Sequence, residues 1–367
     1  MQFNIKVKRT NLMEALRCQQ SVLDRKATQS IFSHVKLDAS NGKLNIEGSD
    51  GNLMLKYQID CETIANGAIT LPGHILYNLV RKSNKEFLNI KCSNDSVEID
   101  YGSGSFNLNT LDPEDFPKIP EVADSLVFKI FSTDLLEKIK MVKIAMANDE
   151  IRAHFNGIHI EGDEDGLRFV ATDGHKMAVF TEKMDCNKFD MILSRKSVET
   201  IVALISHEEE ICCYKDNNQV MFKAKNFFFI SRLVNGSFPD YKALIPNSIE
   251  GIFQDSIGNL KSSLDRISIL SSQLSRIITT VKLQDESIIK CDNISHGWSG
   301  EEKLEGEYKG SDFAFNIDAN IWLDFLRLFE DGKTKLEYHG INKAILMKHE
   351  NYNNFTYITM PGIVNSD

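Results

Sequence analysis

The feature that most constrains this chain is a pattern that occurs twice, 123 positions apart, in residues 37–54 and again in residues 160–177. Both copies alternate apolar and polar residues and contain an Asp-Gly pair near their ends, Asp50-Gly51 in the first and Asp173-Gly174 in the second. A fainter third copy occupies residues 281–293. A repeat this long exceeds the roughly 20- to 50-residue modules of solenoid proteins. Each copy is therefore expected to belong to a whole domain.

Each copy also has the same neighbours. An amphipathic helical pattern precedes it, a second one follows it, and alternating strands close the unit at residues 105–111, 228–233 and 355–360. The pattern predicts an α+β fold with three similar domains, each with two helices laid on an antiparallel sheet. The expected domains are residues 1–122, 123–246 and 247–367, joined by proline-containing linkers. Three domains in a row suggest an arc, and arcs tend to close into rings by symmetry.

The starts of the helices are predicted from capping residues. Asn11 with Glu14, and Asp134 with Glu137, resemble a capping box at the first helix of units one and two. For the second helix of each unit, the expected start signals are Pro72 as an early helical residue and Ser194 and Asp318 as caps.

The composition excludes several classes of protein. No signal peptide pattern opens the chain, and no apolar run approaches the length that spans a bilayer. The seven cysteines are scattered without a Cys-x-x-Cys pair, which predicts reduced thiols in a cytoplasmic protein. The net charge of −10 argues at first sight against nucleic acid. Net charge does not say where charges lie, however, so a basic surface on an acidic body remains possible.

An active site is not expected. Asp173 and His175 form the most chemistry-like cluster, but Asp50 occupies the position of Asp173 in the first copy, where no histidine follows. A position shared between repeats is better explained by the fold, because Asp-Gly makes a turn at the end of a strand. The remaining histidines have no metal-ligand spacing, and no nucleotide-binding fingerprint appears. We therefore expect a binding protein with no catalytic residue, no metal and no cofactor.

Several segments resemble one family. Residues 170–178 read VATDGHKMA and residues 229–241 read FISRLVNGSFPDY. With further blocks in the same order, at 106–108, 115–117, 145–157 and 360–361, the whole chain resembles the bacterial sliding clamp, the beta subunit of DNA polymerase III.

The resemblance implies a head-to-tail homodimer, a ring of six clamp domains around duplex DNA that slides without reading sequence. It implies a non-catalytic subunit of the DNA polymerase III holoenzyme, which tethers the polymerase and so provides processivity. The implied partners are double-stranded DNA, the polymerase alpha subunit, the clamp loader, and other polymerases, ligase and mismatch-repair proteins that carry clamp-binding peptides. No membrane partner is implied.

The resemblance also assigns residues. DNA contacts are expected at Arg25, His74, Arg152, Arg195 and Lys196. The dimer contact is expected to join Phe106 and Leu108 to Ile269 and Leu270 of the partner. A groove for hydrophobic peptides is expected at Phe155, Thr172, Gly174, His175, Lys176, Met177, Pro239, Leu244, Ile278, Ile341, Met360 and Pro361. The family usually has an arginine where Ala243 stands, so the rim of this groove is altered.

Two alternatives to a clamp stay open at this point. One is a repeat scaffold that binds proteins but no DNA. The other is an enzyme centred on Asp173 and His175. Retention on circular DNA separates the clamp from the scaffold, and a measurable turnover would favour the enzyme.

Overall fold

The computed structural model describes residues 2–93, 96–102, 104–120, 125–148, 151–205, 209–246, 248–270, 279–293, 296–340 and 343–362. The chain forms two compact units. Unit 1 comprises residues 1–136, 186–189 and 193–235, and unit 2 comprises residues 137–185, 190–192 and 236–367. Within the described residues no helix has the length and apolar character needed to cross a membrane. None of the seven cysteines, all of which lie in the described residues, forms a disulfide.

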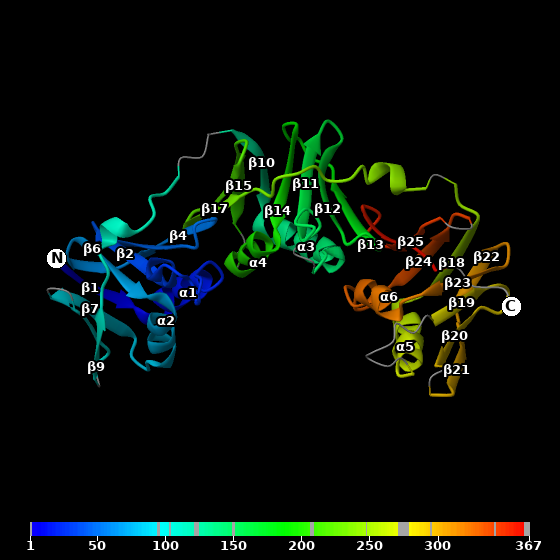
Figure 1. Ribbon diagram of the computed structural model, residues 1–367, viewed down its shortest axis with the longest axis horizontal. Helices are drawn as coiled ribbons and strands as arrows, with labels where there is room; N and C mark the ends of the chain where they lie inside the picture. The colour runs from blue at the N-terminus through cyan, green and yellow to red at the C-terminus, as the bar shows by residue number, and fades with distance from the viewer. Residues whose placement is uncertain are drawn as a thin grey trace. The chain divides into compact units, whose positions relative to one another are not determined.

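The strands form four sheets (Figure 1). The first runs in the order β5 (Glu62–Ala65), β1 (Phe3–Lys8), β7 (Phe87–Ser93), β8 (Ser96–Asp100) and β9 (Ser105–Asn109). The second runs β10 (Leu126–Phe131), β15 (Glu210–Lys215), β16 (Gln219–Lys223), β17 (Phe227–Arg232), β4 (Leu53–Asp60), β3 (Lys43–Ser49), β2 (His34–Ser40) and β6 (Gly67–Pro72).

The third sheet runs β14 (Phe189–Ser194), β11 (Gly157–Asp163), β12 (Gly166–Thr172), β13 (Lys176–Glu182), β26 (Phe355–Thr359), β25 (Ile345–His349), β24 (Lys333–Tyr338), β18 (Gly251–Ser256) and β22 (Glu307–Gly310). The fourth runs β21 (Trp298–Lys303), β20 (Ile288–Asn293), β19 (Thr279–Leu283) and β23 (Phe313–Ile317).

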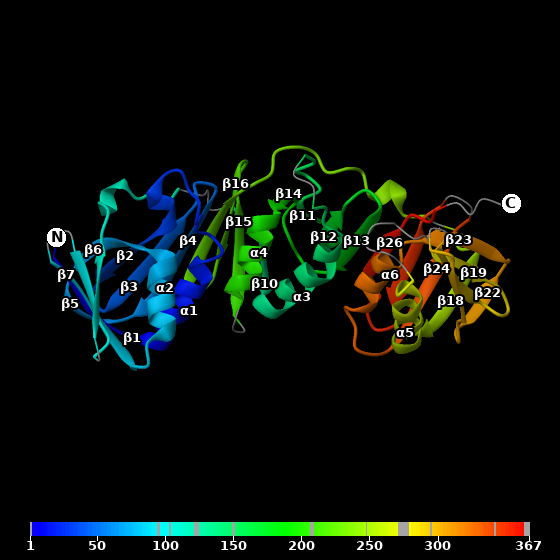
Figure 2. The ribbon, with the colours of Figure 1, turned by 60° about the horizontal axis from the view of Figure 1, so that its bottom comes forward.

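Six α-helices occur in the described part of the chain. They are α1 (Arg9–Gln19), α2 (Gly73–Lys82), α3 (Ser132–Val142), α4 (Arg195–Leu204), α5 (Ile257–Ser268) and α6 (Ala319–Leu326). Helix α1 packs beside α2 and helix α5 beside α6, as Figures 1 and 2 both show. Each buries an apolar stripe; in α1 it consists of Leu12, Ala15 and Leu16. The repeating plan of helix pairs and antiparallel sheets follows the sequence prediction.

The predicted starts of two helices are wrong. Helix α1 begins at Arg9, so Asn11 lies inside it, and α3 begins at Ser132, so Asp134 lies in its first turn. The reason is a direct entry from the preceding strand. The Arg9 N–H donates to the Glu86 carbonyl at 2.8 Å, and the Ser132 N–H donates to the Glu209 carbonyl at 2.9 Å. Because a neighbouring backbone carbonyl accepts from the first helical N–H, these helices begin without the predicted side-chain caps.

The second helices follow the prediction more closely. The Ser194 hydroxyl accepts a hydrogen bond from the Ser197 N–H, and the Asp318 carboxylate accepts one from the Asn320 N–H, so both residues cap their helices. The prediction for Pro72 is wrong by one position, because Pro72 is the N-cap residue of α2 and the helix begins at Gly73.

Two strand pairings join consecutive repeats. We call the antiparallel pair β4·β17 the first junction and the antiparallel pair β13·β26 the second junction. At the first junction Met54 pairs with Ile230, and at the second Met177 pairs with Ile358. Met54 and Met177 are equivalent in the 123-residue repeat. Each junction lies within one compact unit.

Candidate functional site

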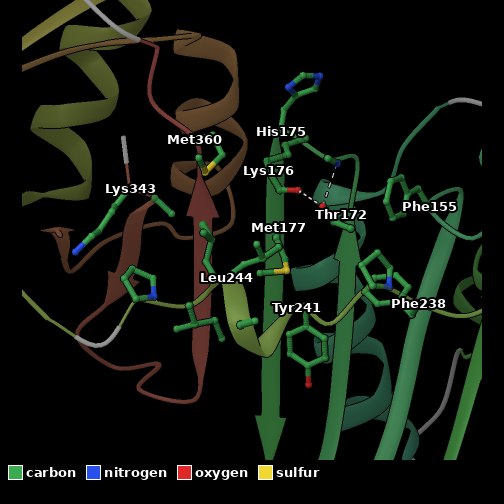
Figure 3. Close-up of a pocket in the computed structure, with 17 residues that line it drawn as sticks. Phe155, Thr172, His175, Lys176, Met177, Phe238, Tyr241, Leu244, Lys343 and Met360 are labelled. Carbon is green, nitrogen blue, oxygen red and sulfur yellow. Dashed lines mark hydrogen bonds between the residues drawn. The ribbon is translucent and has the colours of Figure 1, made fainter. Parts of the chain in front are cut away.

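The most prominent site lies at the second junction, beside the turn that joins β12 to β13. The Asp173 carboxylate accepts hydrogen bonds from the N–H groups of His175 (2.8 Å) and Lys176 (2.9 Å). The Thr172 hydroxyl donates to the Lys176 carbonyl at 2.7 Å and accepts from the Gly174 N–H at 3.1 Å (Figure 3). Gly174 has a φ of +91°, which favours glycine. Asp173 therefore shapes the turn, as its repeat in Asp50 predicted.

A groove of about 670 Å³ opens beside this turn. Figure 3 shows Phe155 and Phe238 on one side of β13 and Lys343 and Met360 on the other. The complete lining consists of Phe155, Thr172, Gly174, His175, Lys176, Met177, Phe238, Pro239, Tyr241, Ala243, Leu244, Ile245, Pro246, Lys343, Ala344, Ile358 and Met360. This volume lies in the range of ligand-binding clefts, and most of the lining is apolar.

A buried cluster forms the floor of the groove. Val170, Met177, Leu346 and Ile358 pack together there with Tyr241, and all are less than a tenth exposed. Leu244 and Met360, in contrast, are 61% and 56% exposed. A fixed floor with exposed aliphatic residues at its edge suits one or two apolar side chains of a ligand.

Tyr241 is held from below by charged groups. Its hydroxyl donates to Glu161 Oε1 at 2.7 Å, and the same oxygen lies 2.8 Å from Lys242 Nζ. Burial raises the pKa of Tyr241, and the adjacent Glu161 carboxylate raises it further. For Glu161, burial opposes ionisation, but the Lys242 ammonium and the Tyr241 hydroxyl leave its pKa below the usual value. The tyrosine thus stays neutral and fixed under the groove.

An aromatic stack supports the opposite wall. The Phe238 ring lies on the His159 ring at a centroid distance of 4.5 Å and an interplanar angle of 9°. His159 is 3% exposed, and its Nε2 lies 2.6 Å from Asp190 Oδ2. Phe155 meets the edge of Phe238 and carries the Arg152 guanidinium over its own ring at 5.2 Å. Sequence reasoning missed His159 because its role depends on a cross-strand neighbour and a linker residue.

The rim of the groove is polar. Lys176 Nζ donates to Asp324 Oδ2 at 2.8 Å, while His175 and Lys343 are exposed. No Asp or Glu is among the described residues that line the groove. The arrangement offers an apolar channel with a polar edge and provides no nucleophile paired with a base. It can bind a short extended segment of another chain.

The structure brings together most of the residues predicted for this groove. Nine line it: Phe155, Thr172, Gly174, His175, Lys176, Met177, Pro239, Leu244 and Met360. Pro361 does not line it, and Ile278 and Ile341 lie outside the described residues. Sequence reasoning missed the wall residues Phe238, Tyr241, Ile245, Pro246, Lys343, Ala344 and Ile358. Several of these adjoin a predicted residue in the linker, which is the one signal that could have found them.

The residues predicted to contact DNA fall into two groups. Arg25 and His74 line a shared cavity of about 200 Å³ in unit 1. Lys196, at the start of α4, reaches the same neighbourhood, because its Nζ donates to the Val22 carbonyl at 2.9 Å. It also donates to Asp50 Oδ2 at 2.6 Å. Arg152 belongs instead to unit 2, beside Phe155 at the groove.

Arg195 and the predicted dimer residues lie at the ends or edges of their elements. Arg195 is the first residue of α4 and lies 3.8 Å from Glu199. Phe106 is 42% exposed on β9, an edge strand of the first sheet, and Ile269 is 76% exposed just after α5. Leu108 and Leu270 are half-buried. The roles of these residues in binding DNA or a second subunit stay predictions.

One cluster of metal-type donors occurs in the described residues: His159, Glu161 and Asp190, with one donor atom from each within 4.8 Å of the others. Glu161 already accepts from Tyr241 and lies against Lys242 and Arg168. Two neighbouring cations oppose the binding of a third, so these residues fit a structural network better than a metal site.

Comparison with known proteins finds matches to one family along the chain. Models of the DNA polymerase III beta subunit match the chain in three consecutive parts. The N-terminal domain matches residues 1–120, the central domain residues 129–240, and the C-terminal domain residues 242–363. The prediction of three similar α+β domains is confirmed.

Relatives named beta sliding clamp match over almost the whole length. The protein of Pseudomonas putida is 25% identical over 361 residues, which are 97% of this chain and 98% of the relative. That of Haemophilus influenzae is 26% identical over 366 residues, 98% of this chain and 99% of the relative.

Solved structures share the fold. The DNA polymerase sliding clamp of Bacillus subtilis matches with a TM-score of 0.93 at 21% identity, covering 99% of this chain and 100% of the other. A sliding clamp of Pseudomonas aeruginosa, solved bound to griselimycin, matches with a TM-score of 0.94 at 24% identity and the same coverage.

Proposed function

This chain belongs to the DNA polymerase III beta subunit family, and we propose that it is a DNA sliding clamp. In this role it encircles duplex DNA as a non-catalytic processivity factor and holds the replicative polymerase through the groove at the second junction. The observation that carries the proposal is the groove itself, an apolar channel within a chain that matches the family from end to end.

The ring is proposed to be a head-to-tail dimer. Phe106 is exposed on the edge strand β9 and lines an apolar cavity of about 170 Å³ with Leu79, Val80 and Ile99. Ile269 is exposed in the third domain. Exposed apolar residues beside an unpaired sheet edge favour pairing with another chain. Because the two faces differ, the pairing of Phe106 and Leu108 with Ile269 and Leu270 of the partner subunit is a heterologous contact. Two such contacts between the same two subunits would close a ring.

Contact with DNA is proposed to run through phosphates. Arg195 and Lys196 stand at the N-terminus of α4, where backbone N–H groups and the helix dipole also favour anions. Arg25 and His74 lie in the same unit. We include Arg152 among the proposed DNA contacts, although it lies beside the groove. Since phosphate contacts carry no sequence information, these residues allow sliding along any duplex.

The groove is proposed to receive short hydrophobic peptides from the polymerase alpha subunit, the clamp loader, other polymerases, ligase and mismatch-repair proteins. The polar rim, the exposed Met360 and Leu244, and the fixed floor around Met177 support this use. One or two aliphatic or aromatic side chains would enter, and the backbone of the peptide would stay at the polar edge.

The test is retention of the loaded protein on DNA. A dimer of about twice the 41.6 kDa chain mass should remain on closed circular DNA and leave when the circle is cut. Equal retention on linear and circular DNA would exclude topological linkage. Binding of partner peptides with no retention on either DNA would instead favour the protein scaffold.

A further inference from the structure

The first junction repeats the turn of the groove almost atom for atom. The Asp50 carboxylate accepts from the N–H groups of Asn52 (2.8 Å) and Leu53 (2.7 Å), and Gly51 has a φ of +90°. The Ser49 hydroxyl donates to the Leu53 carbonyl at 2.9 Å and accepts from the Gly51 N–H at 3.1 Å. These are the interactions of Thr172 to Lys176. The same scaffold therefore stands beside a second surface.

That surface has its own, smaller cavity of about 190 Å³, which we call the cradle. It is lined by Ser49, Gly51, Asn52, Leu53, Met54, Pro117, Lys118, Pro120, Gln219, Ile230 and Arg232. Met54 and Ile230 form a buried apolar floor together with Phe116. The cradle lies entirely within unit 1.

The cradle differs from the groove in charge. The backbone N–H of Arg232 donates to the Asn52 carbonyl, as that of Met360 donates to the His175 carbonyl, so Arg232 occupies the position of Met360. Lys118, in the linker, stands where the second linker has Asp240. Two cationic side chains thus replace an apolar and an acidic one at equivalent places.

These two cations are available for a ligand. Arg232 and Lys118 are exposed, and neither makes an ion pair with any residue that the structure describes. No carboxylate is among the described lining residues. Asp50, the acidic residue of the turn, is held by Lys196 at 2.6 Å. An anion that enters the cradle would therefore meet two cations with no competing acid in the described lining.

We propose that the cradle is a second docking site, which takes a short acidic peptide segment of a partner protein. A guanidinium binds a carboxylate with two parallel hydrogen bonds, and Lys118 offers a second positive charge. The floor of Met54 and Ile230 suits an aliphatic side chain next to the acidic one. A peptide can supply both groups, whereas a DNA backbone has no aliphatic side chain. The small volume fits one such side chain, so the site supplements the groove.

The experiment measures fluorescence anisotropy with the full-length dimer. One probe is a fluorescein-labelled peptide Gly-Asp-Leu-Glu-Asp-Gly, and its analogue carries Asn and Gln at the acidic positions. The acidic peptide should bind at least tenfold more tightly than the analogue and weaken as salt rises. Arg232→Met, which installs the residue found at the groove, should abolish that preference.

A second probe keeps this proposal separate from the proposed function. A labelled peptide with two leucines and a phenylalanine should bind Arg232→Met as it binds the wild type. Met360→Asp should no longer bind this apolar peptide but should bind the acidic peptide as the wild type does. The cradle proposal fails if the acidic peptide and its neutral analogue bind alike, if Arg232→Met leaves the preference intact, or if it weakens retention on DNA instead. If the wild type binds the acidic peptide but not the apolar one, the result counts against the groove and leaves the cradle proposal standing.

Discussion

The two junctions of this chain share a scaffold and differ in what stands on it. Both pair equivalent strands in the same register, and both place a glycine with φ near +90° in the same turn. The groove has about 670 Å³ and the cradle about 190 Å³. Tyr241 and Met360 at the groove correspond to Ile119 and Arg232 at the cradle. The repeated fold thus carries two surfaces of different size and charge.

The reason lies in a small number of side chains. The Asp50 and Asp173 carboxylates accept backbone hydrogen bonds that fix the two turns in the same way, so the turn backbone is common to both junctions. The junctions differ in the linkers and in the last strand of each pairing, where Met360 and Asp240 of the second junction are replaced by Arg232 and Lys118 at the first. Function is therefore assigned by the residues around the turn.

The largest effect is expected from Met360→Asp. A carboxylate at the exposed edge of the groove would have to lose water next to an apolar peptide, which should weaken binding on the order of thirtyfold or more. Titration with the apolar peptide measures this change, and the sedimentation mass should stay that of the dimer. The matched control, Arg232→Asp, should leave this peptide's affinity unchanged. Loss of the dimer in Met360→Asp would show that the groove is misplaced.

A second comparison uses the two glycines. Gly174→Ala and Gly51→Ala each force an alanine into the left-handed region, at a cost of about 1–2 kcal/mol in the free energy of unfolding. A Cβ on Gly174 would also lie 3.3 Å from the Arg152 guanidinium, whereas one on Gly51 meets only the Phe32 ring at 3.5 Å. Denaturant unfolding should show similar losses of unfolding free energy for the two variants, but only Gly174→Ala should weaken binding of the apolar peptide. If both substitutions weakened binding of the apolar peptide equally, the claim that only the second junction binds this peptide would be contradicted.

The aromatic support of the groove can be removed separately. His159→Leu keeps an apolar group of similar size but ends the stacking on Phe238 and the contact with Asp190. We expect roughly fivefold weaker binding of the apolar peptide, since aromatic pairs contribute about 0.5–1.5 kcal/mol. The matched control is Lys36→Leu, at the equivalent position of the first repeat. Unchanged binding in His159→Leu would exclude a role for the stack in positioning Phe238.

The smallest effect concerns acid. The pKa of Glu161 lies below its usual 4.5 in the folded protein, so its carboxylate stabilises the fold above pH 4.5. This contribution is lost as the pH falls through the lowered pKa. Glu161→Gln should therefore cost about 1 kcal/mol of unfolding free energy at pH 7 and less at pH 3. Urea unfolding at both values measures the difference. A cost that persists in acid would mean that the charge of Glu161 is not its source.

Much of the fold was predictable from the sequence, and particular residues show why. The 123-residue spacing placed Asp50 and Asp173 in equivalent turns, because an Asp-Gly turn depends on local sequence alone. Capping at Ser194 and Asp318 was local in the same way. The starts of α1 and α3 could not be predicted from local sequence, because their first N–H groups donate to the Glu86 and Glu209 carbonyls, which are distant in the chain.

The walls of the groove were also beyond local reasoning. His159 reads as a strand residue, and only the fold brings Phe238 of the linker onto its ring. Lys196 was predicted as a DNA contact from the family resemblance alone, and its ion pair with Asp50 appears only once the two repeats are packed together. The cradle could not be found from local sequence because Lys118, Gln219 and Arg232 are far apart in the chain.

The central claim is that this protein tethers a polymerase to DNA through the groove. The most direct test is the length of DNA made in a single binding event by a partner polymerase and clamp loader on a primed circular template. The wild type and Arg232→Met should both support long products, and Met360→Asp, with its dimer intact, should support only short ones. Long products with Met360→Asp, or none with the wild type, would contradict the account.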